Sequence, residues 1–145
     1  MRSILCAVVT LLAVAACAPL GSLTSAEPEP GDREEVVSAN IVFEAGSANI
    51  SVIQDAVVRG LARRAGEPGV TAVRVVGHTD TVGSASANQQ LSEARAAAVV
   101  SALLGHGMDT NLILSSGRGE LDPAVATADE VREIRNNRVE VTILK

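Results

Sequence analysis

The chain has 145 residues, a formal net charge of -5 and a single aromatic side chain, Phe43. This length suits one modest domain. Because aromatic residues are almost absent, its core must be built from Val, Leu, Ile and Ala, and stacking on aromatic rings cannot be a main means of binding a ligand. Because a phosphate backbone is held chiefly by clustered Lys and Arg, the acidic balance argues against nucleic acid and against charge-driven binding to anionic lipid.

The first 16 residues have the layout of an export signal. One cation, Arg2, precedes an apolar run that is too short to span a bilayer and that ends in two alanines. The sequence VAAC at 14–17 resembles the bacterial lipobox, in which the signal is cut before a cysteine that is then acylated. The resemblance implies a stable lipid anchor on Cys17. An ordinary signal cut near Ala16 or Ala18 is the alternative.

Residues 17–35 are expected to be the lipidated cysteine and a flexible linker. They carry Pro19, Pro28 and Pro30 among Ser, Thr, Gly and Glu, with no apolar period. Either the linker holds the domain at a distance from the membrane, or it is a segment without a length requirement. Ala18 is not the Asp that retains enteric lipoproteins at the inner membrane, so the resemblance implies the outer membrane, with the domain facing the periplasm.

Residues 36–145 are expected to form one domain. Val70 to Val76 is the strongest strand, because it is almost continuously apolar and rich in β-branched residues. Ile53, Val57 and Leu61 recur at helical spacing on an amphipathic helix. The expected elements are a strand at 40–43, a helix from 50 to before 66, a strand at 70–76, a helix from about 88 to 104, a strand at 111–115, a short acidic helix at 128–135 and a strand at 138–144.

This order, β-α-β-α-β-(short α)-β, predicts an α/β (α+β) two-layer sandwich in which two main helices pack against one mixed four-stranded sheet. Phe43 is expected in the core. Ser47 and Asn49 are the candidate N-caps of the first helix. Arg132 and Arg135 are expected on the solvated face of the short helix.

Asp80 and Arg95 are the candidate site residues. Asp80 follows the end of the central strand, where α/β architectures open a crevice, and Arg95 lies on the second helix about two turns after Asn88. A carboxylate can bind an ammonium group, and Arg can bind a carboxylate in a bidentate fork. The pair therefore fits the α-amino acid end of a ligand. Alternatively, the two side chains pair with each other and join loop to helix.

Four motifs occur in one order and at one set of spacings: GHTD at 77–80, LSEARA at 91–96, GRGE at 117–120 and NNRVEV at 136–141. Together they resemble the OmpA-like peptidoglycan-binding domain, which is also found in peptidoglycan-associated lipoproteins. The resemblance covers residues 41–143. It implies non-covalent binding of the diaminopimelate residue in the stem peptide of the cell wall.

The resemblance also implies roles for individual residues. Asp80 and Arg95 hold the free amino-acid end of the ligand, Thr79 and Asn88 help to line the pocket, and Arg138 lies close by. Alanine at Asp80 or Arg95 is expected to leave the fold intact and to abolish wall binding. The chain departs from the family at Asn137, where an Arg is common.

We expect no enzyme activity, cofactor or metal site. Only His78 and His106 are present, without metal-ligand spacing, and no serine lies in a GxSxG motif. The alternative function is a module that docks a periplasmic protein of the Tol type on the same scaffold, with weak wall binding or none.

Overall fold

The computed structural model describes residues 35–145. The predicted signal at 1–16 and the predicted lipidation site, Cys17, lie outside the described residues. The elements, in chain order, are β1 (Glu35–Val42), α1 (Val52–Ala65), β2 (Ala72–Gly77), α2 (Ala85–Gly105), η1 (Thr110–Leu112), β3 (Ile113–Gly117), η2 (Ile134–Asn136) and β4 (Arg138–Leu144). Among these elements no helix has both the length and the apolarity needed to cross a membrane.

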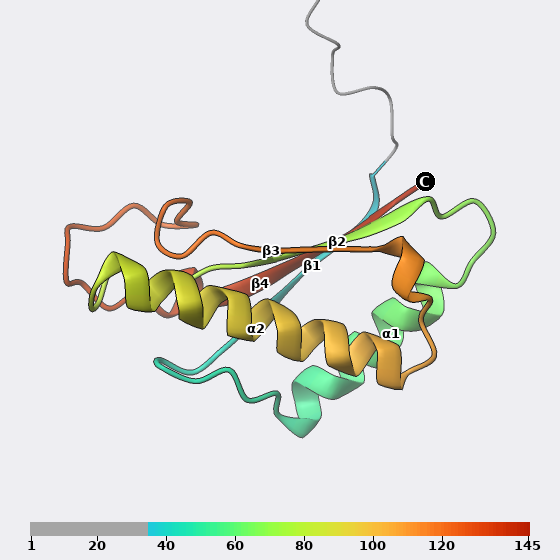
Figure 1. The fold of residues 1–145 in the computed structure, drawn as a ribbon, viewed down its shortest axis with the longest axis horizontal. Helices are drawn as coiled ribbons and strands as arrows, with labels where there is room; N and C mark the ends of the chain where they lie inside the picture. Colours follow the sequence, from blue (N-terminus) through green and yellow to red (C-terminus); the bar gives the residue numbers. More distant parts are fainter. Residues whose placement is uncertain (1–34) are drawn as a thin grey trace, which may run out of the picture. The chain divides into compact units, whose positions relative to one another are not determined.

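The strands form one mixed sheet in the order β1-β4-β2-β3. β2 and β3 are parallel, and β4 runs antiparallel to both β1 and β2. Both helices lie on one face of this sheet (Figure 1). The predicted two-layer α+β sandwich and the interior position of the strand after α1 are confirmed. β1 is longer than expected, since its pairing with β4 begins at Glu35.

The core lies between the sheet and the two helices. It is aliphatic, as the composition predicts, and Phe43 is buried in it as expected. Its fully covered strand residues include Val73, Val75, Val139, Val141 and Ile143, and its helix residues include Val58, Leu61, Val99 and Leu103. Alternation along β4 therefore separates a covered face from an open one.

The start and the buried face of α1 differ from the expectation. Ser51 is the N-cap, in a capping box with Gln54, so the predicted caps were wrong. Ile53 is 80% exposed and Val57 44% exposed, whereas the buried side chains start at Val58. Figure 1 shows the physical reason: the first turns of α1 lie away from the sheet, below α2, so apolar residues there have no surface to cover.

The short acidic helix expected at 128–135 does not form. The segment is a loop that ends in the single turn η2. Glu130 has a φ of 56°, which is incompatible with a right-handed helix. In addition, the Thr81 hydroxyl donates to the carbonyl of Ala128 and accepts from the amide of Val131, so it takes backbone groups that a helix would pair internally.

Candidate ligand-binding site

Two glycines bring α2 into contact with the ends of β2 and β3. Gly77 and Gly117 are paired across these parallel strands. A Cβ on Gly77 would lie 2.0 Å from the carbonyl oxygen of Ser92, and a Cβ on Gly117 would lie 2.4 Å from the Ser92 hydroxyl. That hydroxyl also accepts a hydrogen bond from the amide of Gly119 at 2.9 Å. The close approach fixes the position of α2 over the strand ends.

Asn88 and Arg95 lie one turn before and one turn after Ser92, on the same buried face of α2. The helix starts at Ala85, three residues earlier than expected, because Ser84 caps it and accepts a hydrogen bond from the amide of Ala87. The helix therefore carries Asn88 in its first turn instead of beginning there.

The guanidinium of Arg95 is 0% exposed and joins three separate segments. Nε donates to the carbonyl of Ser47 at 2.8 Å, and Nη2 donates to that of Glu44 at 2.9 Å. Nη1 donates at 2.9 Å to both the carbonyl of His78 and Oδ1 of Asn137. These bonds use four of the five N–H groups of the guanidinium, which leaves one on Nη2.

Burial lowers the pKa of Arg95, and the nearby charge of Asp80 opposes this effect. The guanidinium also lies over the ring of Phe43, with Cζ 5.6 Å from the ring centroid. This contact further favours the charged form, because an aromatic face attracts a cation. Arg95 is thus a buried cation stabilised by oxygens, a ring and a neighbouring acid.

Asp80 is 5% exposed and lies just beyond β2. Its Oδ2 accepts from Nδ2 of Asn137 at 2.7 Å, and its Oδ1 accepts from the amide of Val82 at 3.3 Å. The ion pairs within residues 35–145 do not include Asp80 with Arg95. Instead, Asn137 stands between them, with its amide oxygen toward the cation and its N–H toward the carboxylate. The two charges are linked but remain apart.

Asp80 faces a cavity of about 200 Å³ between the first turn of α2 and the neighbouring loops. Asn88 lines it, and its Nδ2 donates to Glu120 at 2.6 Å. The lining residues are Ala45, Gly46, Asp80, Val82, Asn88, Leu91, Arg132 and Asn137. The cavity thus combines one carboxylate, one guanidinium and two amides with apolar walls.

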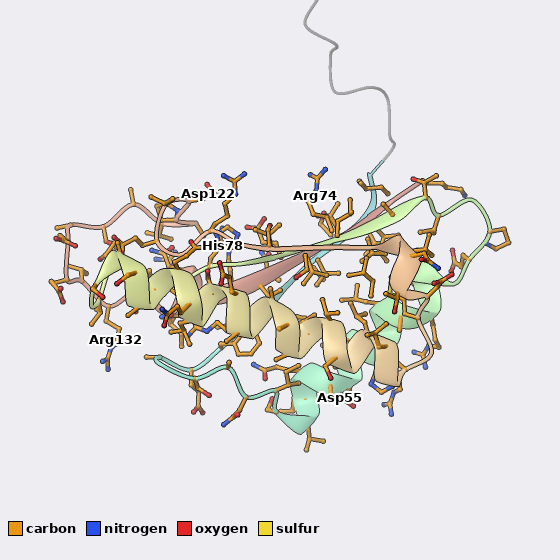
Figure 2. The ribbon with its side chains drawn as sticks, in the orientation of Figure 1. Asp55, Arg74, His78, Asp122 and Arg132 are labelled. Carbon is orange, nitrogen blue, oxygen red and sulfur yellow. The ribbon has the colours of Figure 1, made fainter. Side chains whose placement is uncertain are left out.

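Arg132 and Asn137 are the site residues that sequence reasoning missed. Arg132, expected on a solvated helix face, lies at the cavity, and Figure 2 shows it on the helical side of the sheet, beside the first turn of α2. Asn137 was noted only as a departure from a family pattern. Nothing in the sequence indicates that its amide faces Asp80 and Arg95 at once.

The structure does not bring Thr79 or Arg138 to this cavity. Thr79 is buried, and its hydroxyl has no hydrogen-bond partner among the described residues. Arg138 points to the open face of the sheet, where Nε and Nη2 donate to Oε1 of Glu140 at 2.8 and 2.6 Å. Of the five predicted residues, Asp80 and Asn88 line the cavity, and Arg95 lies behind it, joined to Asp80 through Asn137.

Sequence comparison places this chain within a family. The model of the OmpA family matches residues 42–138. The chain is 34% identical over 104 residues to the probable lipoprotein YiaD of Escherichia coli (strain K12), covering 72% of this chain and 48% of that protein. It is 29% identical over 126 residues to outer membrane protein A of Bordetella avium, covering 87% of this chain and 65% of that protein. The chain thus spans less than two thirds of either relative.

Solved structures show the same fold. The peptidoglycan-associated lipoprotein from Burkholderia pseudomallei superposes with a TM-score of 0.66 at 23% identity, covering 72% of this chain and 88% of that one. The C-terminal domain of Helicobacter pylori MotB superposes with a TM-score of 0.61 at 25% identity, covering 71% of this chain and 81% of that one. At this level of identity the likeness establishes the architecture.

Proposed function

The chain belongs to the OmpA family, and on that premise we propose that it binds peptidoglycan non-covalently through the diaminopimelate residue of the stem peptide. We further propose that residues 36–145 are the binding domain and that a lipid on Cys17, followed by the linker at 17–35, anchors it to the outer membrane. The named relatives support this location, because they include a probable lipoprotein and an outer membrane protein.

The observation that carries the proposal is the Asp80 carboxylate at the wall of the 200 Å³ cavity. A carboxylate can accept about four hydrogen bonds, and two N–H groups, from Asn137 and Val82, are bound here. Acceptor positions are therefore left for an ammonium group that enters the cavity. A charge-assisted bond of this kind contributes about 1.5–3 kcal/mol.

The carboxylate of the same ligand end is favoured by two cations. Arg95 supplies its buried charge from behind Asn137, and Arg132 lies at the cavity itself. An ammonium and a carboxylate on one carbon thus meet charges of opposite sign. Thr79 and Arg138, which the resemblance also implies, lie outside the cavity, so the proposal depends on Asp80 and Asn88 at the cavity and on the charge of Arg95 behind it.

The test is sedimentation with purified peptidoglycan of the diaminopimelate type. Asp80→Asn keeps the size of the side chain and removes its charge, so we expect affinity to fall at least about tenfold. Glu67→Gln, at an exposed acid in the turn after α1, is the matched control and should bind normally. Circular dichroism checks that both variants are folded. Wild-type binding by folded Asp80→Asn would show the assignment to be wrong.

A further inference from the structure

The face of the sheet that the helices leave open holds a second and larger cavity. Its volume is about 460 Å³, and it shares no lining residue with the Asp80 cavity. Figure 2 shows Arg74 and Asp122 on the side of the sheet away from the helices. We call this the open-face cavity, and its floor is made by outward side chains of β2, β3 and β4. The proposed wall-binding function does not use it.

The strand register arranges the floor in rows. Val76 of β2 is level with Glu140 of β4 and Ser116 of β3. Two residues earlier along β2, Arg74 is level with Thr142 of β4. Because alternate residues of neighbouring strands face the same side, these side chains share one face of the sheet, on which polar and charged groups surround the apolar Val76. Hydroxyl groups from Ser116 and Thr142 therefore stand beside charged groups.

His78 lines this cavity and has unused hydrogen-bonding capacity. The residue is 1% exposed, yet neither Nδ1 nor Nε2 has a hydrogen-bond partner in the described part of the chain. Nε2 lies 4.0 Å from Oε1 of Glu140, which is beyond hydrogen-bond distance. Buried polar groups are normally paired, because an unpaired one costs about 1–3 kcal/mol. The ring nitrogens are thus available to a group that enters the cavity.

Arg138 lies behind the same surface, outside the cavity lining, and one of its nitrogens has no partner among the described residues. Arg138 is 5% exposed, and two of its nitrogens bind Glu140, but Nη1 has no partner within residues 35–145. Burial and the charge of Arg138 lower the pKa of His78, against the opposing effect of Glu140 and Asp122. A neutral imidazole presents one donor and one acceptor, which suits a hydroxyl or amide group.

The charges around the cavity favour a ligand of negative charge. Arg74 and Arg118 are exposed at the cavity, and Arg138 lies beside it, against the carboxylates of Asp122 and Glu140. Glu140 is already bound by Arg138 at 2.6 Å. Three cations against two anions leave one positive charge uncompensated. Guanidinium groups bind carboxylates in planar, bidentate geometry.

From these features we propose that the open-face cavity binds a small carboxylate-bearing ligand whose carboxylate is accompanied by hydroxyl or amide groups. Arg74 and Arg118 bind the carboxylate, and the ring nitrogens of His78 bind the neutral polar groups. Two sources share this chemistry, an acidic sugar and an N-acylated amino acid. Their carboxylates would occupy the same two guanidinium groups.

Nuclear magnetic resonance of the two histidine rings tests the proposal on the full chain. The chain contains 2 histidines, and the ring of His106 lies elsewhere, with Nε2 2.9 Å from Oδ1 of Asp55. His106 is thus an internal control. The acidic-sugar arm compares D-glucuronate with D-glucose. The amino-acid arm compares N-acetylalanine with N-acetylalaninamide, which lacks the charge.

We expect a saturable shift of the His78 resonances with at least one carboxylate probe and no shift with its neutral counterpart. The probe that responds shows whether the ligand is an acidic sugar or an N-acylated amino acid. Arg74→Gln combined with Arg118→Gln should weaken this binding at least about tenfold. Arg59→Gln, at an exposed cation on α1, should not. The proposal is overturned if neither carboxylate shifts His78 more than its neutral counterpart, or if the double variant binds like the wild type.

Failure here and failure of wall binding are distinguishable. Asp80→Asn should leave the His78 titration unchanged, because Asp80 lines the other cavity. The Arg74 and Arg118 variants should leave the Asp80 cavity intact for the same reason. A titration altered by Asp80→Asn would contradict the separation of the two sites.

Discussion

Replacing Arg95 by alanine removes the side chain that joins the loop before α1, the end of β2 and Asn137. The carbonyl of His78 is a buried acceptor that loses its donor, which costs about 1–3 kcal/mol. Oδ1 of Asn137 also loses the guanidinium and keeps only a 3.4 Å hydrogen bond from the amide of Asp80. The carbonyls of Glu44 and Ser47 are reached more easily by water and cost less.

Two further terms enter the sum. Loss of the contact with the ring of Phe43, 5.6 Å from Cζ, costs about 0.5–2 kcal/mol. Removing a buried charge recovers part of its desolvation, which is the reason that the pKa of Arg95 is lowered. We therefore expect Arg95→Ala to lower the free energy of unfolding by about 3–5 kcal/mol, as for other buried charges that lose their partners.

Urea denaturation followed by circular dichroism measures this loss. With a slope of about 1–3 kcal/mol per molar urea, the midpoint should fall by roughly 2 M. Arg59→Ala, at an exposed position on the other helix, is the control and should change stability little. A loss below about 1 kcal/mol at Arg95 would refute the reasoning. The structure thus revises the sequence-based expectation that alanine at this position leaves the fold intact.

Two other predictions concern β2 and the residue that follows it. Gly77→Ala places a Cβ 2.0 Å from a backbone oxygen of α2, so we expect the free energy of unfolding to fall by about 1–3 kcal/mol and wall binding to weaken. Gly60→Ala is the control, because open space surrounds that position, and it should leave stability unchanged or raise it. Equal effects of the two substitutions would contradict the packing argument. Because burial and Arg138 hold the pKa of His78 below 6.5, with Glu140 and Asp122 opposing, the unfolded chain binds the proton first. The free energy of unfolding should therefore decrease as the pH falls from about 6.5 toward the folded pKa. His78→Gln should lose this part of the pH dependence. An unchanged pH profile in that variant would show that His78 is not its cause.

The fold follows from local patterns to a large extent. The apolar run at 70–76 and the alternation from Val139 to Ile143 predict strands that pack against helices, and both do. The exposed first turns of α1 could not be foreseen, because the periodicity of Ile53 and Val57 is local. Whether those turns reach the sheet depends on how the two helices pack. The loop at 128–135 escaped prediction for a similar reason, since its backbone bonds go to Thr81.

Charge and spacing in the sequence indicate Asp80 and Arg95 as a candidate pair, but they do not predict how the two side chains are arranged. The alternatives are direct pairing or separation around a ligand. The answer depends on Asn137, which lies 57 positions after Asp80 in the chain. No spacing rule connects such distant positions. Only the pairing of β4 beside β2 brings its amide between the two charges.

Binding of a stem-type tetrapeptide with diaminopimelate at its third position, compared with the same peptide carrying lysine there, tests the central claim most directly. Inside the peptide one amino-acid centre of either residue is held in amide bonds, so diaminopimelate keeps a free ammonium and carboxylate on one carbon, whereas lysine keeps only an ammonium. The comparison therefore isolates the α-amino acid end that Asp80 and Arg95 are proposed to hold. Calorimetric titration of the full chain should show saturable binding of the diaminopimelate peptide, at least about tenfold weaker binding of the lysine peptide, and loss of the difference in Asp80→Asn. Equal affinity for the two peptides, or a difference that persists in Asp80→Asn, would contradict the claim.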